Sequence, residues 1–268
     1  VSPDERAVAD ADSMTYLTTV EGARGCILDR NGNVLVSNRA TYNIVIVNFV
    51  LFNSQSPNEN ILKLLQMCQT LGIECQSHFP VTDTRPYEYD MQSLSTTWQN
   101  YFRMFLNNRD YDLDISASTL MRNLREAYRI PNDWDADDVY NVIAVRYELE
   151  LRSVDNTGLE NYMLAKDVDA ESLAAVAELG IPGVIIQSGT VREYKTAYAA
   201  HLLGTIGAMG PDEWAEYQQK GYAMNAMIGT SGIEKAFEEY LHGTSGTKIT
   251  TVSTTGDVLN EYYTSLPQ

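Results

Sequence analysis

The chain contains few cysteines for its length, and they are not spaced as metal ligands. Three cysteines, Cys26, Cys68 and Cys75, occur among 268 residues, and none forms a CxxC pair. Zinc and iron–sulfur sites draw on closely spaced cysteines, so neither is expected here. For Cys68 and Cys75 two alternatives stay open. They form a disulfide in an oxidising compartment, or they stay as buried free thiols, because Cys68 belongs to an apolar helical stripe.

Positive charge is also scarce. The chain has 19 Lys and Arg residues against 36 Asp and Glu residues, a formal net charge of −17 at pH 7. Such a chain repels a phosphate backbone and an anionic membrane surface, which argues against nucleic acid as a partner. The three histidines, His78, His201 and His242, stand far apart without ligand spacing. We therefore predict no metal and no cofactor.

Long apolar runs are missing as well. No run reaches the roughly 18 apolar residues that a membrane-spanning helix needs, and the chain begins with Val1. We therefore expect a trimmed fragment from which a leader or membrane anchor has been removed. With 44% apolar residues, the chain can bury the core of one large domain or two smaller ones.

Strand patterns occupy both ends of the chain. Residues 24–36 predict a β-hairpin, because two short apolar runs flank Asn31-Gly32, a pair that readily adopts the positive φ angles of a tight turn. Residues 41–50 predict a third, mostly buried strand. Residues 247–253 and 258–264 predict a closing hairpin. Residues 1–21 predict only a loose helix or lead-in.

Helical patterns dominate the middle. Apolar residues at helical spacing, preceded by capping residues, predict helices over residues 56–72, 96–107, 117–129, 136–150 and 170–179. Residues 184–186 predict a buried strand, and 192–207 a tightly packed helix. The predicted fold is α+β. A small mixed or antiparallel sheet, built from residues 1–52 and 151–268, forms a discontinuous pedestal domain, and residues 53–150 form an inserted, mainly helical head.

Three separated stretches carry candidate site residues: residues 24–32, 192–207 and 229–246. In the third stretch Ser231 and Glu234 have the spacing of a capping box, which by itself explains both residues. The candidate residues of the three stretches are Arg24, Gly25, Asp29, Arg30, Asn31, Gly32, Arg192, Tyr194, Gly229, Gly232 and Glu234.

In this order the three stretches resemble the non-catalytic N-terminal domain of class B penicillin-binding proteins, called the pedestal or dimerisation domain. That family has Arg-Gly-x-Ile-x-Asp-Arg-Asn-Gly, then Arg-x-Tyr-Pro-x-Gly and Ala-Ala-His-x-Leu-Gly, then Gly-x-x-Gly-Ile-Glu. Lys195 and Ala197 stand where the family has proline and glycine. The resemblance covers both ends of the chain and leaves residues 53–150 unmatched.

The resemblance implies an extracytoplasmic domain whose parent protein is anchored in the cytoplasmic membrane by an N-terminal helix. The domain would position a C-terminal D,D-transpeptidase that cross-links peptidoglycan. The head would contact division, elongation or sporulation proteins. The transpeptidase motifs Ser-x-x-Lys, Ser-x-Asn and Lys-Thr-Gly do not occur in this order here. This chain is therefore predicted not to be an enzyme.

Two other functions are alternatives for this sequence. One is a stand-alone scaffold for division or sporulation proteins that has no transpeptidase. The other is an acid/base hydrolase that uses Asp29 and Glu234. For the charges themselves we predict a network in which Arg24 or Arg192 pairs with Asp29 or Glu234, because arginine and carboxylate suit two-point hydrogen bonding. In the alternative, each is a local turn or cap residue.

Overall fold

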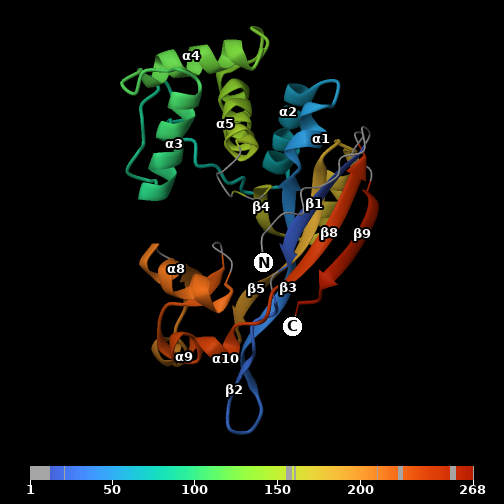
Figure 1. Cartoon of the computed structure of the whole chain (residues 1–268), viewed down its shortest axis with the longest axis vertical. Coiled ribbons are helices and arrows are strands. Elements are labelled where there is room, and N and C mark those ends of the chain that lie inside the picture. Colours follow the sequence, from blue (N-terminus) through green and yellow to red (C-terminus); the bar gives the residue numbers. More distant parts are fainter. Residues whose placement is uncertain are drawn as a thin grey trace. The chain divides into compact units, whose positions relative to one another are not determined.

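The structure, a computed structural model, describes residues 13–20, 22–154, 159, 161–209, 211–222, 226–253 and 258–267. The chain divides into two compact units. The first, which we call the pedestal unit, comprises residues 1–42 and 188–268, and the second, the head unit, comprises residues 43–187. Helices and mainly antiparallel strands from both ends of the chain confirm the predicted α+β class (Figure 1).

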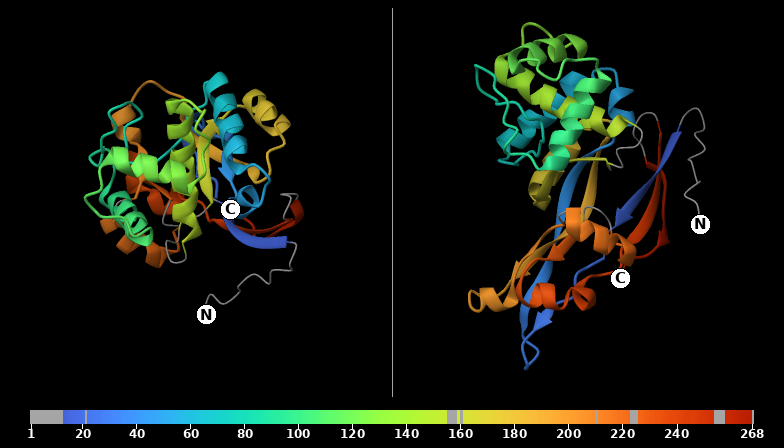
Figure 2. Two further views of the ribbon diagram at one scale, coloured as in Figure 1. Left: turned by 90° about the horizontal axis from the view of Figure 1, so that it is seen from above. Right: turned by 60° about the vertical axis from the view of Figure 1, so that its left-hand side comes forward.

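A three-stranded antiparallel sheet joins the two ends of the chain within the pedestal unit. It has the order β1 (Ser13–Val20), β8 (Gly246–Ser253) and β9 (Val258–Ser265), and these strands lie side by side in Figures 1 and 2. The closing hairpin is confirmed, although residues 254–257 of its turn lie outside the described residues. Residues 1–21 were expected to form a loose helix or lead-in, but residues 13–20 form strand β1. Residues 1–12 and 21 lie outside the described residues. The partner strand that decides β1 lies far away in the sequence, where local periodicity gives no signal.

A second sheet is arranged around β3 (Val34–Ile46). β3 pairs with β2 (Ile27–Leu28), β4 (Tyr162–Val168) and β5 (Val184–Tyr194). The antiparallel pairing of β2 with the start of β3 confirms the predicted hairpin. β3 is one continuous strand where the pattern predicted two, and β5 runs well beyond the predicted residues 184–186.

The turn of this hairpin differs from the predicted Asn-Gly turn. Gly32 has a φ of 86°, whereas Asn31 is not among the described residues with positive φ. The Gly32 amide donates to the Asp29 carbonyl at 3.0 Å, which makes a turn followed by a left-handed glycine. The Asp29 carboxylate accepts bonds from the amides of Asn31 and Asn33 at 2.8 and 2.9 Å. Together with the Asn33 side chain, these bonds lower the pKa of Asp29.

The head unit contains the predicted helices. Ser116, Asp135 and Asp169 each accept a backbone amide at the start of the helix that follows, as expected for N-caps. The helices are α1 (Asn48–Phe52), α2 (Pro57–Thr70), α3 (Thr96–Asn108), α4 (Ala117–Ala127), α5 (Ala136–Ser153) and α6 (Ala170–Glu178).

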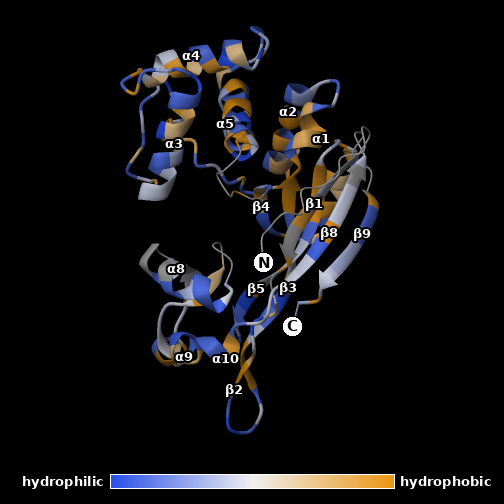
Figure 3. Ribbon diagram, in the orientation of Figure 1, coloured by the Kyte–Doolittle hydropathy of each residue, from blue (hydrophilic) through white to orange (hydrophobic). Residues whose placement is uncertain are grey.

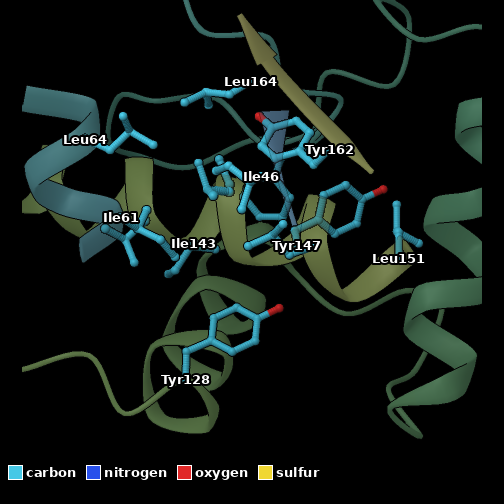
Figure 4. Packing of buried hydrophobic residues seen from close by; sticks show 14 of the residues in the cluster. Ile46, Ile61, Leu64, Tyr128, Ile143, Tyr147, Leu151, Tyr162 and Leu164 are labelled. Atoms are coloured by element: carbon cyan, nitrogen blue, oxygen red, sulfur yellow. The ribbon is translucent and has the colours of Figure 1, made fainter. Parts of the chain in front are cut away.

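Helix α5 contributes more than half a dozen residues to the head core, and its hydrophobic positions alternate with hydrophilic ones along the helix (Figure 3). Its Ile143 and Tyr147 are completely buried, and Figure 4 shows them among Ile46, Ile61 and Leu164. Strand β4 and helix α6 pack into this same core, which explains why the head unit runs over residues 43–187 where the pattern predicted 53–150. The sequence pattern indicates whether a segment is a helix or a strand, but not which segments it packs against. The prediction therefore assigned β4 and α6 to the pedestal.

One buried carboxylate interrupts the apolar core of the head. Glu148 on α5 is completely buried and accepts a hydrogen bond from Arg152 at 2.5 Å and from the His78 ring at 3.0 Å. The His78 ring in turn stacks on Trp98, with ring centroids 3.6 Å apart. Burial raises the pKa of Glu148. The hydrogen bond from His78 and the positive charge of Arg152 lower it by more, so the pKa lies below its usual value. The carboxylate is thus held ionised inside the head.

Short elements complete the pedestal unit. Residues 192–207, predicted as one packed helix, instead comprise the end of β5, the single-turn helix α7 (Ala200–Leu203) and the strand β6 (Ile206–Ala208). The backbone of β6 bonds to β7 (Met227–Gly229), and the Lys195 amide donates to the Leu35 carbonyl at 2.9 Å. These long-range bonds replace helical ones. The remaining elements are α8 (Pro211–Tyr217), a 3₁₀ turn (Gln218–Lys220), α9 (Gly232–Ala236) and α10 (Glu238–Leu241).

The cysteines are free thiols in the structure. Cys68 is buried, whereas Cys26 and Cys75 are exposed, so of the two residues expected to be buried only Cys68 is. Within the described residues, no helix combines the length and the apolar character needed to cross a bilayer.

Replacing Leu120 with alanine should destabilise the head. Leu120 is completely buried, so the truncation leaves a cavity and lowers the free energy of unfolding by about 2–5 kcal/mol. The matched control is Leu113→Ala, at a leucine that is 61% exposed and should change stability by less than about 0.5 kcal/mol. Urea unfolding of both variants measures the difference, and equal shifts would show that the core is wrongly assigned.

Candidate functional site

Arg24 lies at the centre of a buried cluster of charges in the pedestal unit. Its Nε donates to Glu234 Oε2 at 2.6 Å, and its Nη2 donates to Glu238 Oε2 at 2.6 Å. Nη2 also bonds the Glu234 carbonyl at 3.0 Å, and Nη1 bonds Glu238 Oε1 at 3.2 Å. One guanidinium thus holds two carboxylates, one from α9 and one from α10.

Arg192 approaches the same carboxylate from strand β5. Its Nε donates to Glu234 Oε1 at 2.8 Å, so the two oxygens of Glu234 are bonded to two different arginines. Nη1 of Arg192 donates to Asn38 Oδ1 on β3 at 3.0 Å, and the Asn38 amide in turn donates to the Arg24 carbonyl. This ring of bonds fixes β3, β5 and the segment before β2 to helix α9.

Glu238 extends the cluster to two further segments. Its Oε2 accepts the Gly229 amide at the end of β7 at 2.7 Å. Its Oε1 lies 3.5 Å from His242 Nδ1, and the His242 ring stacks on Tyr222 with centroids 3.7 Å apart. The sequence prediction missed Glu238, Asn38 and His242. A signal for Glu238 did exist, because it stands four residues after Glu234, the spacing that places two side chains on one helix face.

Burial makes the cluster energetically demanding. Glu234 is completely buried, and the side chains of Arg24 and Arg192 are only 9% and 3% exposed. Burial lowers the pKa of Arg24, but the hydrogen bonds that its guanidinium donates to Glu238 and Glu234, together with their negative charges, outweigh this effect and raise the pKa above its usual value. Two arginines face two glutamates, so the cluster is balanced in charge. A balanced and hydrogen-bonded cluster tolerates burial, whereas removal of one member leaves an uncompensated charge.

Two glycines allow the segments around the cluster to approach closely. A Cβ atom at Gly229 would lie 2.1 Å from the Glu234 carbonyl oxygen, well inside van der Waals contact. Gly232 has a φ of 57°, and a Cβ there would lie 2.5 Å from the Leu202 carbonyl oxygen. The glycines of the third stretch thus make room for the backbone that carries Glu234.

The predicted site residues divide into two groups. The structure brings Arg24, Arg192 and Glu234 together, with Gly229 and Gly232 beside them. Gly25 lies next to Arg24, and its amide donates to the Leu241 carbonyl at 2.7 Å. Tyr194 follows Arg192 on β5, and 38% of its surface is exposed.

The remaining predicted residues, Asp29, Arg30, Asn31 and Gly32, form the hairpin turn and do not join the cluster. Of the two carboxylates predicted to pair with Arg24 or Arg192, Glu234 is the one that does. The Asp29 carboxylate is occupied by backbone amides of its own turn. The capping-box interpretation of Ser231 and Glu234 is also wrong. Ser231 makes no side-chain cap bond and instead accepts the Thr205 amide at 3.1 Å, while Glu234 turns to the arginines.

The charged groups of this cluster bind one another, and they are not arranged for proton transfer. Both oxygens of Glu234 are bonded to guanidinium groups, which leaves neither positioned to accept a proton from a substrate. The described part of the chain contains no group of three or more His, Cys, Asp or Glu side chains arranged to hold a metal ion. The arrangement is that of a structural junction.

Comparison with known proteins agrees with the geometry. A family model described as "Penicillin-binding Protein dimerisation domain" matches residues 19–268, so the chain belongs to this family. Among curated relatives, peptidoglycan D,D-transpeptidase MrdA of Acinetobacter baumannii is 25% identical over 62% of this chain and 23% of its own length. MrdA of Escherichia coli K12 is 26% identical over 88% of this chain and 34% of its own length. The chain thus spans about a quarter to a third of these relatives.

Solved structures share the fold. Penicillin-binding protein 2B of Streptococcus pneumoniae strain 5204 aligns over 96% of this chain and 40% of its own, with a TM-score of 0.51 and 17% identity. At this identity the likeness concerns the fold alone. The α+β architecture is therefore common to both proteins.

The cluster should stabilise the pedestal unit strongly. Glu234→Gln removes the charge that Arg24 and Arg192 share, and we expect local stability to fall by about 3–5 kcal/mol. Hydrogen exchange of peptides from residues 227–241 should then accelerate about a hundredfold or more. Peptides from α5 in the head unit provide the internal reference.

Glu216→Gln is the matched control, because Glu216 pairs with Lys220 on the exposed surface and its loss should leave exchange unchanged. Unaltered exchange in Glu234→Gln would contradict a stabilising role for the cluster.

Protonation of His242 should weaken the pedestal unit. Burial lowers the pKa of His242 below 6.5, against the attraction of Glu238, so the folded state binds this proton less tightly than the unfolded chain does. Stability should therefore decrease as the pH falls through about 6.5. Thermal unfolding between pH 8 and pH 5 measures the effect.

His242→Phe keeps a ring to stack on Tyr222 and should remove the His242 contribution. His201→Gln, at an exposed position, should retain the full pH dependence. Identical pH profiles for the wild type and His242→Phe would refute the assignment.

Proposed function

We propose that this chain is the non-catalytic, extracytoplasmic pedestal of a peptidoglycan D,D-transpeptidase. The catalytic domain would follow in the same parent protein, and the pedestal would hold it in position for peptidoglycan cross-linking. The parent would be anchored in the cytoplasmic membrane by a preceding helix. Membership of the dimerisation-domain family supports this proposal, as does the name of the curated relatives, of which this chain matches only a part.

The family match over residues 19–268 carries the proposal, and the charge cluster around Arg24 is the structural feature that fits it. The cluster ties the segment before β2, strands β3, β5 and β7, and helices α9 and α10 to one another by short bonds. A pedestal transmits position only if its segments are fixed relative to each other. Buried bidentate arginine–carboxylate bonds supply such fixation, since both the distance and the orientation are constrained.

The main alternative is a stand-alone scaffold that recruits division or sporulation proteins through the head and has no transpeptidase. The same cluster would serve such a scaffold equally well. The two proposals differ in what the complete reading frame encodes. A Ser-x-x-Lys motif after residue 268 would favour the pedestal, because this motif supplies the transpeptidase nucleophile.

Labelling with a fluorescent penicillin tests the proposal. We expect the protein made from the complete reading frame to be labelled covalently on its nucleophilic serine, whereas residues 1–268 alone remain unlabelled. Complete protein denatured before labelling is the control for non-specific attachment.

Covalent labelling of the 1–268 fragment would overturn the non-catalytic assignment. A complete reading frame without the motif, and without labelling, would favour the scaffold. In either case the stability measurements on the cluster stand independently.

A further inference from the structure

The head unit has a pocket that the charge cluster of the pedestal does not involve. It has a volume of about 350 Å³ and is formed by a loop around Arg85, by helix α4 and by the start of α5. This volume falls within the range of small-ligand sites and suits one bulky side chain with its neighbours. All of its lining residues belong to residues 43–187, the head unit.

Three arginines line this pocket: Arg85 from the loop, and Arg122 and Arg125 from α4. Across the described residues, none of the three guanidinium groups lies within 4.0 Å of a carboxylate. Arg109 and Arg152, elsewhere in the head, each bind a glutamate at 2.5 Å. Unpaired arginines that converge on one pocket are unexpected in a chain with 36 acidic and 19 basic residues, where carboxylates are abundant.

The side chain of Arg125 has unused hydrogen-bonding capacity. Its Nη2 donates to the Pro131 carbonyl, which holds the side chain in place. Its Nε is buried and has no hydrogen-bond partner among the described residues. A buried donor without a partner is unfavourable, so the Arg125 side chain is one hydrogen bond short of full satisfaction.

Apolar side chains lie among the arginines. Met121 and Val139 are buried, being 3% and 4% exposed, and both contribute to the lining together with Pro86. Arg85 lies over the ring of Tyr87, with its Cζ 5.6 Å from the ring centroid. The pocket therefore combines an apolar floor with positive charge at separate points around it.

We propose that this pocket binds an acidic segment of a partner polypeptide, in which two carboxylates flank an apolar side chain. The carboxylates would pair with the arginines, and the apolar side chain would cover Met121 and Val139. A small inorganic anion fits less well, because it would leave the apolar floor in water. Arginine recognises carboxylates through two parallel bonds, which gives the contact a defined orientation.

The proposal goes beyond the pedestal function and is independent of it. It uses residues of the head unit alone, and it holds whether or not a transpeptidase follows in the parent protein. Failure of the penicillin-labelling experiment would therefore leave it intact, and failure of the peptide experiment would leave the pedestal intact.

Titration calorimetry with short synthetic peptides tests the proposal on the full chain. The probe is acetyl-Glu-Gly-Phe-Gly-Glu-amide, whose three larger side chains share one face when the peptide is extended. Its neutral counterpart replaces both glutamates with glutamine, and a third peptide replaces phenylalanine with glycine. We expect saturable binding of the first peptide and at least about fivefold weaker binding of the other two.

Arg85→Gln combined with Arg122→Gln should weaken binding of the acidic peptide at least about fivefold. Both residues are exposed, and neither donates a hydrogen bond in the described residues, so the fold should persist. Arg103→Gln, at an exposed arginine on α3 outside the pocket, is the matched control and should bind like the wild type. Circular dichroism confirms that the variants are folded.

Three outcomes would overturn the proposal. Equal binding of the acidic and neutral peptides would remove the role of charge, and equal weakening by the control variant Arg103→Gln would remove the role of the pocket. Inorganic pyrophosphate that binds at the pocket more tightly than the acidic peptide would identify a phosphate site instead.

Discussion

The paired hydrogen bonds of Glu234 with Arg24 and Arg192 are the constraint on which the pedestal unit depends. Glu234 is completely buried, and it is held by partners that stand 210 and 42 positions earlier in the chain. Neither arginine can be buried without the carboxylate, and the carboxylate cannot be buried without them. The close approach at Gly229 and the second carboxylate at Glu238 follow from the same requirement. Each of the three motifs thus contributes at least one residue to the same junction, Arg24 from the first, Arg192 from the second and Glu234 from the third.

The two units solve the problem of buried polarity at different scales. In the head, Glu148 is a single carboxylate next to a large apolar core; Arg152 balances its charge, and the His78 ring forms a further hydrogen bond to it. In the pedestal the apolar core around Ile27, Val36 and Leu241 is small, and the buried ion pairs are correspondingly more prominent. The pedestal's geometry is therefore specified largely by directional bonds, and the head's by packing. The residues of the family motifs lie in the pedestal unit, and the arginine-lined pocket lies in the head unit.

Local patterns predicted what local chemistry decides. The head helices followed from apolar periodicity and from caps such as Asp135 and Asp169, and the first hairpin from its turn. Patterns failed where a distant partner decides. Residues 192–207 contain good helix formers, yet their backbone bonds go to β7 and to Leu35. At the site, the resemblance identified Arg24, Arg192 and Glu234 but gave Asp29 equal standing. Only the fold separates a carboxylate satisfied by its own turn from one that needs an arginine.

Strand β1 lies beside β8, although more than 220 residues separate them along the chain. The head unit, by contrast, is one uninterrupted segment, so it can fold as soon as residue 187 has emerged during synthesis. The pedestal unit cannot be completed until β8 and β9 have been synthesised. Arg24 has no carboxylate partner from this cluster until Glu234 has been synthesised. Pairing across such a separation is intrinsically slow, because the entropy of closing the loop is lost before any contact forms. During synthesis the head unit can therefore be folded while the pedestal unit is still incomplete.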